Sequence, residues 1–198
     1  MKNNYSDITP IPLELIKKFE PKSSWLLHEG ELHGVDHMTR VFILQELICD
    51  NLEEQGVAVN REAIRWASMA HDVGRLSDSG LDQQHGNRSA QWIKDNLSEH
   101  MSSEMLDVVT YSVHWHVPPD SEAPTMTTEL KVLKDADALD RVRLGDLDTR
   151  YLRTDVAKEM VGLSEDLYQS YLDNRVDDAF DAVLNAGLSL GIIARGTG

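Results

Sequence analysis

The residues best suited to chemistry are a histidine and an aspartate that adjoin each other, His71 and Asp72, at the end of an apolar stretch, IRWASMAHDV. Helical phase places Ile64, Ala67 and His71 on one face, which we expect to be buried. A charged aspartate in that environment has to be ion-paired, hydrogen-bonded or bound to a metal, because burial of an unpaired charge is costly. The pair is therefore a candidate metal site, and a buried pair that only caps the helix remains the alternative.

A second group of histidines lies in the segment HGVDHMTRV. Gly34 indicates that a helix begins near Asp36, which puts His37 in its first turn and His33 in the preceding loop. We expect His37 to face the same cleft as the His71-Asp72 pair. His33 either lines that cleft or is an ordinary loop histidine.

A third group is the acidic segment KDADALDRVR. Leu130, Leu133 and Asp137 share one helix face at steps of three and four, so Asp137 is the acid predicted to point inward, although an acid on the helix surface is the alternative. The other two acids are expected to be solvated or to pair with nearby arginines: Asp135 and Asp140, with Arg141 and Arg143.

Together, His37, His71, Asp72 and Asp137 form a mixed nitrogen and oxygen ligand set contributed by three separate helices. Such a set suits a divalent ion of Mn, Fe, Co, Ni or Zn, whereas Ca and Mg prefer oxygen ligands alone. Four protein ligands leave a position for water or substrate on a five- or six-coordinate ion, which is typical of a catalytic site. The sequence predicts one ion and leaves a second open.

The elements that position these residues are predicted to be helices almost throughout, and no segment shows strand-like alternation. The expected helices are 11–19, 37–55, 61–73, 86–97, a helix from about 102 that ends before Pro118, 129–143 and 164–186. The segment 144–162 is ambiguous, with short helices expected, and the tail GIIARGTG is predicted to be frayed. We expect one all-α domain over residues 1–198, because no linker or composition change marks a boundary.

Composition excludes several classes of protein. The chain has 34 acidic and 19 basic residues and a net charge of −15, which disfavours general binding to nucleic acid. No apolar run approaches the roughly 18 residues that a membrane span needs, and the N-terminus lacks a signal peptide, so we expect no membrane association and a cytoplasmic location. The one cysteine, Cys49, is predicted to be a buried core thiol.

The ordered set His…His-Asp…Asp, in the contexts HMTRV, MAHDVGR and DADALDR, resembles the HD-domain superfamily of metal-dependent phosphohydrolases. The resemblance covers about residues 25–143 and implies a bundle of five or more core helices. Beyond it, we expect a C-terminal helical extension over about 144–190. By this resemblance the metal ligands are His37, His71, Asp72 and Asp137.

The resemblance also implies roles for further residues. Histidines at positions similar to His85 and His114 bind a second metal or the substrate phosphate in such proteins, and His33 is a third candidate for these roles. His116 is expected to point elsewhere. Many members carry lysine or glutamate three residues after the aspartate, whereas this chain has Arg75, which can clamp a phosphate but cannot act as a base at neutral pH.

The expected function is hydrolysis of a small phosphomonoester or phosphodiester, such as a nucleotide, by metal-activated water. Asp72, Arg75, His85 and His114 are the predicted catalytic and phosphate-binding residues. Two alternatives stay open: a di-iron oxygenase of the same fold, and a non-catalytic regulatory module that binds a metal or a nucleotide. The sequence also leaves a homodimer open.

Overall fold

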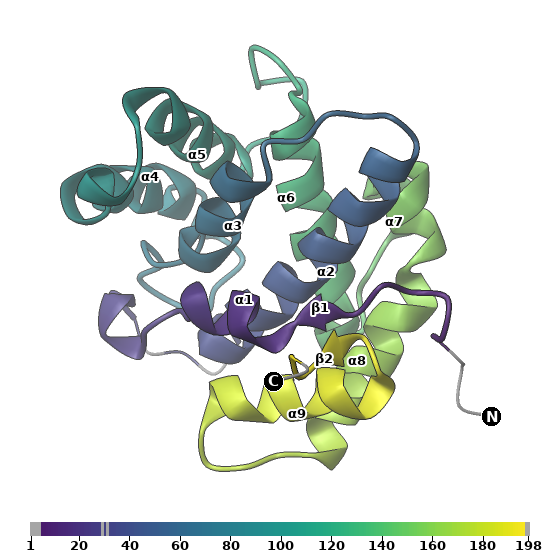
Figure 1. Cartoon of the computed structure of the whole chain (residues 1–198). Helices are drawn as coiled ribbons and strands as arrows, with labels where there is room; N and C mark the ends of the chain where they lie inside the picture. The colour runs from purple at the N-terminus through teal and green to yellow at the C-terminus, as the bar shows by residue number, and fades with distance from the viewer. Residues whose placement is uncertain (1–4, 29, 31, 197–198) are drawn as a thin grey trace.

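The computed structural model describes residues 5–28, 30 and 32–196, and this part of the chain is built mainly from helices (Figure 1). The longer helices are α2 (Val35–Glu54), α3 (Arg61–Ala70), α4 (His85–Asn96), α5 (Ser103–Trp115), α6 (Thr128–Leu139), α8 (Val161–Asp173) and α9 (Ala179–Leu190). The shorter elements are α1 (Leu13–Lys18), α7 (Asp155–Glu159), the strands β1 (Ile11–Pro12) and β2 (Ile193–Ala194), and 3-10 turns that include Asp140–Leu144 and Thr149–Tyr151. The prediction of an all-α protein is confirmed.

Helix α2 runs through the middle of the molecule and packs against α3, α6 and α9 (Figure 1). It is buried on almost every face, and side chains such as Phe42, Leu44 and Ile48 are fully buried. A helix surrounded in this way belongs to the interior. It ends before Gly56, whose φ of 78° is the left-handed conformation that glycine adopts readily.

Helices α3, α4 and α5 form one side of the bundle. The Asn60 side chain caps α3 by accepting a hydrogen bond from the Ala63 amide, as its residue type predicts. The helix ends at Ala70 rather than near Val73, so His71 and Asp72 lie in the turn that follows it. That turn approaches α4 closely, because a Cβ added to Gly74 would lie 2.4 Å from the Ser89 backbone nitrogen.

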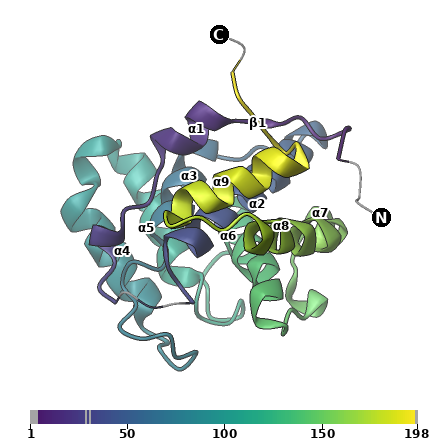
Figure 2. The same cartoon turned by 90° about the horizontal axis from the view of Figure 1, so that it is seen from below.

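The C-terminal region contains two helices where one helix over 164–186 is predicted. Helices α8 and α9 pack against each other, and α9 also packs on α2 (Figure 2). The polar segment 174–178 separates them, and the Asp178 side chain starts the second helix by accepting a hydrogen bond from the Asp181 amide.

The predicted fraying of the tail is wrong for residues 191–194, and residues 197–198 lie outside the described part of the chain. Ile192 and Ile193 are buried, and β2 pairs in parallel with β1 near the other end of the chain. The Ile11 amide donates a 2.9 Å hydrogen bond to the Ile192 carbonyl. Burial of these two isoleucines outweighs the tendency of a glycine-flanked tail to remain mobile.

Across the residues that the structure describes, no helix combines the length and the apolar character required to cross a membrane.

Candidate metal centre

The four predicted metal ligands converge on one point. His37 lies in the first turn of α2, His71 and Asp72 follow α3, and Asp137 lies on α6. His37 Nε2 is 3.2 Å from His71 Nε2, 3.3 Å from Asp137 Oδ1 and 3.5 Å from Asp72 Oδ2. Three helices of the core therefore place two imidazoles and two carboxylates around a common centre.

His37 and His71 form the first imidazole pair, and their hydrogen bonds determine which nitrogen atoms are available to a ligand. His37 Nδ1 lies 2.7 Å from Asp140 Oδ2, and His71 Nδ1 lies 2.9 Å from the Ser68 carbonyl oxygen. Both acceptors require a proton on Nδ1, which leaves Nε2 of each ring as the nitrogen that faces the centre. A cation placed between them binds both Nε2 lone pairs once His37 has lost its second proton. Two atoms bound to one ion at about 2.1 Å with an angle of 90–110° lie about 3.0–3.4 Å apart, which matches the observed spacing.

A second imidazole pair, His85 and His116, lies on the other side of Asp72. The two Nε2 atoms are 3.2 Å apart, and their Nδ1 atoms are directed at the backbone carbonyls of Asp82 and Val113. Asp72 Oδ1 is 3.2 Å from His85 Nε2 and 3.7 Å from His116 Nε2. This oxygen is buried and accepts no hydrogen bond from the described residues. An unsatisfied buried carboxylate oxygen beside two imidazole nitrogens is suited to a cation.

The structure corrects the expectation for His114. Its ring packs against Trp115 and borders a surface pocket beside Lys94, whereas His116 lies in the second imidazole pair. His116 keeps helical φ and ψ angles at the end of α5, so it shares a face with the buried Val109 and Val113. Helical phase from those two valines was the signal that could have identified it.

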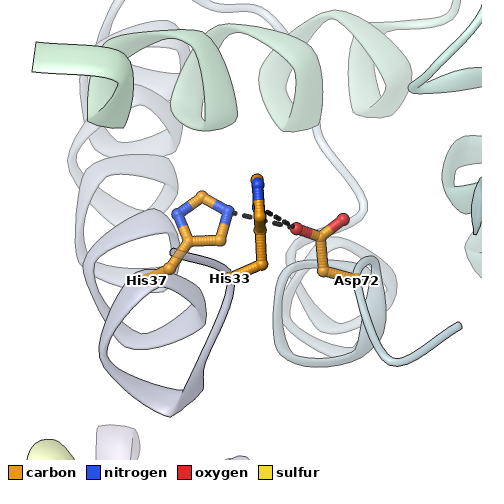
Figure 3. A group of neighbouring side chains, drawn as sticks. All are labelled: His33, His37 and Asp72. Atoms are coloured by element: carbon orange, nitrogen blue, oxygen red, sulfur yellow. Dashed lines mark hydrogen bonds and ion pairs between the residues drawn. The ribbon is translucent and has the colours of Figure 1, made fainter. Parts of the chain in front are cut away.

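His33 and Arg75 both contact Asp72 Oδ2. His33 Nδ1 lies 2.9 Å from this oxygen, and Arg75 Nε donates to it over 2.8 Å. Figure 3 shows His33 and His37 turned toward Asp72 from the same side. Arg75 Nη1 is buried and has no hydrogen-bond partner within the described part of the chain.

The HD-domain family model matches residues 34–142, which is more than half of the chain. The chain belongs to the HD-domain family. HD domains bind divalent metals and mark a superfamily of metal-dependent hydrolases. Comparisons with curated proteins and with solved structures gave no match.

In this HD domain, the two histidines of the first imidazole pair have very different pKa values. Burial lowers the pKa of His71 to about 3, so that ring is neutral at pH 7. Burial and Arg143 oppose a charge on His37, but Asp137, Asp140 and Asp72 prevail and raise its pKa to about 9. In spite of burial, neighbouring histidines hold the pKa values of Asp72 and Asp137 well below the usual range. Both carboxylates are therefore ionised and available to a cation.

Two aspartates of the HD domain, Asp135 and Asp140, are buried and hydrogen-bonded in the core, a role that was not predicted from the sequence. Asp140 binds His37 and Arg40, and it also pairs with Arg143 as the sequence suggested. Asp135 is fully buried and accepts hydrogen bonds from the backbone of residues 153 and 154. Their partners lie far away in the sequence, with the exception of Arg143, so local spacing gave no signal for them.

Proposed function

We propose that this HD-domain protein is a metal-dependent phosphohydrolase that acts on a small phosphoester, such as a nucleotide. The observation that supports it best is Asp72, which presents Oδ2 to the first imidazole pair and Oδ1 to the second. Two imidazole pairs that share one carboxylate favour a two-metal site, with His37, His71 and Asp137 at one ion and His85 and His116 at the other. Borderline divalent ions such as Mn, Fe, Co, Ni or Zn suit these donors.

A divalent ion bound here supplies Lewis acidity, which acidifies water and offsets negative charge on the phosphate oxygens. Arg75 is suited to the substrate phosphate. Its Nε is held by Asp72, which fixes the guanidinium plane, while the buried Nη1 remains free to donate to a phosphate oxygen. The side chain of Asp137 is one-third exposed, so solvent and substrate reach the centre past this residue.

A cavity of about 620 Å³ opens beside Asp137 and His116 and is suited to the leaving group. Its cations are already paired. Lys134 and Arg153 bind Asp120, and Arg141 binds Asp146. Among the described residues of the lining, no surplus cation remains to receive additional phosphates, whereas Tyr151, Pro118 and Pro119 offer flat apolar surfaces. These features favour a substrate with a single phosphate over a polyphosphate.

The proposal is tested with a panel of nucleoside mono-, di- and triphosphates, phosphodiesters and p-nitrophenyl phosphate, each with Mn, Co, Ni and Mg. We expect phosphate release that is fastest with monophosphates, and loss of both bound metal and activity in Asp72→Ala. Unchanged metal content in Asp72→Ala, measured by mass spectrometry, would show that the ligand assignment is wrong. Thermal stabilisation by a nucleotide without any turnover would instead indicate a regulatory module.

The pair of metal subsites also supports one rival function, a di-iron oxygenase. It requires two irons at Asp72, a visible absorption band and consumption of oxygen that depends on substrate. Oxygen uptake without phosphate release would favour this rival, and phosphate release without oxygen uptake would exclude it.

A further inference from the structure

A continuous series of contacts leads from the ligand His37 to helix α8. Asp140 Oδ2 accepts the proton on His37 Nδ1, at 2.7 Å, and also receives Arg40 Nη2 at 3.1 Å. Asp140 Oδ1 accepts from Arg40 Nε at 2.6 Å. The three side chains are each at most 1% exposed, so no water competes for these contacts.

The series continues from Arg40 to two tyrosines. The guanidinium carbon of Arg40 is 4.8 Å from the ring centroid of Tyr171 and 5.4 Å from that of Tyr168. Arg40 Nη1 is held by Asp36 at 3.0 Å. Both tyrosines lie on α8, which begins after residue 142, where the match to the HD-domain family ends.

We propose that Asp140, Arg40, Tyr168 and Tyr171 act together as positioning residues for the metal ligand His37. Helix α8 of the C-terminal extension is therefore part of the metal centre. This inference rests on the proposed metal site but is independent of the substrate.

The physical reason is the choice of imidazole tautomer. A neutral imidazole carries its proton on either nitrogen, and only the tautomer protonated on Nδ1 presents the Nε2 lone pair to a cation. Asp140 selects that tautomer and fixes the ring plane, as carboxylates do beside metal-bound histidines. It has to remain ionised in a buried position, and Arg40 supplies compensating charge together with Arg143.

The tyrosines determine the orientation of Arg40. A guanidinium group is attracted to aromatic faces, and the attraction is stronger where water is excluded. The two rings and Asp36 hold the group so that Nε and Nη2 both face Asp140. Without the rings, Arg40 gains freedom, and Asp140 loses the orientation of one of its two guanidinium partners, the other being Arg143.

The test measures Co²⁺ binding to the metal-free full-length protein, by calorimetry and by the visible absorption of the bound ion. We expect Tyr168→Leu/Tyr171→Leu to weaken Co²⁺ binding about tenfold, and Asp140→Asn to weaken it about 10- to 100-fold, the range typical of groups that orient metal ligands. The Tyr168→Phe variant keeps the ring face at this position and should bind Co²⁺ with wild-type affinity.

Glu46→Gln is the matched control. Glu46 is a buried carboxylate on the same helix α2 and accepts hydrogen bonds from Arg61 and Arg65, but it makes no contact with the metal centre. This variant should lose thermal stability and keep its affinity for Co²⁺.

Wild-type Co²⁺ affinity in a folded Tyr168→Leu/Tyr171→Leu variant would overturn the inference, and so would an equal loss of affinity in Glu46→Gln. If the double variant fails to fold, the single variant Tyr168→Leu decides in the same way, because this side chain is only partly buried. Absence of Co²⁺ binding in the wild-type protein would instead refute the metal site itself.

Discussion

Asp72 is the residue on which the two halves of the site depend, since each of its carboxylate oxygens faces a different imidazole pair. His116 and His85 lie 31 positions apart but have the same arrangement, because each directs Nδ1 at a backbone carbonyl and Nε2 at the other ring. The neighbouring His114 has no part in this arrangement. His114 and His116, which lie two positions apart, therefore allow a direct comparison between a histidine outside the site and one inside it.

We expect His116→Ala to lower the metal content from two ions to one per chain, because it removes a nitrogen ligand from the second subsite. His114→Ala should retain both ions. Elemental analysis of the two purified variants after dialysis against Mn²⁺ checks this. Equal metal content in the two variants would argue against the second subsite.

The raised pKa of His37 makes metal binding dependent on pH. In the metal-free protein His37 keeps its proton up to a pKa of about 9, and a cation at Nε2 has to displace that proton. Affinity should therefore increase with pH, by at most about tenfold per unit, until pH approaches 9. His71 adds no such dependence above its pKa of about 3. Calorimetric titration with Mn²⁺ at pH 6, 7 and 8 would contradict this if the dissociation constant stays constant.

At the scale of elements, the sequence predicted the helices whose signals are local. The start of α2 near Gly34, its end at Gly56 and the Asn60 cap of α3 agree with the structure within a few residues. These signals come from backbone conformation and from side chains that act within one turn. The bundle that holds His37, His71, Asp72 and Asp137 was implied by the resemblance to the HD-domain superfamily and not by these local signals.

With one exception, the errors concern features that depend on distant parts of the chain. The Asp178 cap that separates α8 from α9 was a local signal and was overlooked. In contrast, the pairing of Ile11 with Ile193 and the bonding of Asp140 to Arg40 join residues 100 or more positions apart. Periodicity within a window of sequence carries no information on such contacts.

The close contact between the turn at Gly74 and helix α4 gives a prediction at this scale. Gly74→Ala would bring a Cβ to 2.4 Å from the Ser89 backbone nitrogen, which neither element can accommodate without moving. We expect this variant to lose about 1–3 kcal/mol of stability. Gly162, near the start of α8, has open space around it, so Gly162→Ala should instead gain about 0.5 kcal/mol. Denaturant unfolding of both variants tests the contrast, and a loss of stability in both would contradict it.

At the scale of the whole molecule, the net charge of −15 and the cluster of ionised carboxylates make the metal-free protein electrostatically strained. An ion at a free concentration of 100 times its dissociation constant adds about 2.7 kcal/mol to the free energy of unfolding. For a chain of this size that corresponds to an increase in Tm of roughly 5–11 °C. Scanning calorimetry with and without Mn²⁺ measures the change, and an equal increase in Asp72→Ala would indicate binding elsewhere.

The short sheet formed by β1 and β2 has a consequence for kinetics. Its two strands lie near opposite ends of the described chain, so we expect them to meet only after the intervening helices have collapsed. Contacts that are absent from the transition state affect the unfolding rate of a native protein and leave its folding rate unchanged. Trimming Ile193 to alanine should therefore shorten the lifetime of the folded molecule while refolding proceeds at its normal speed, which stopped-flow fluorescence can resolve.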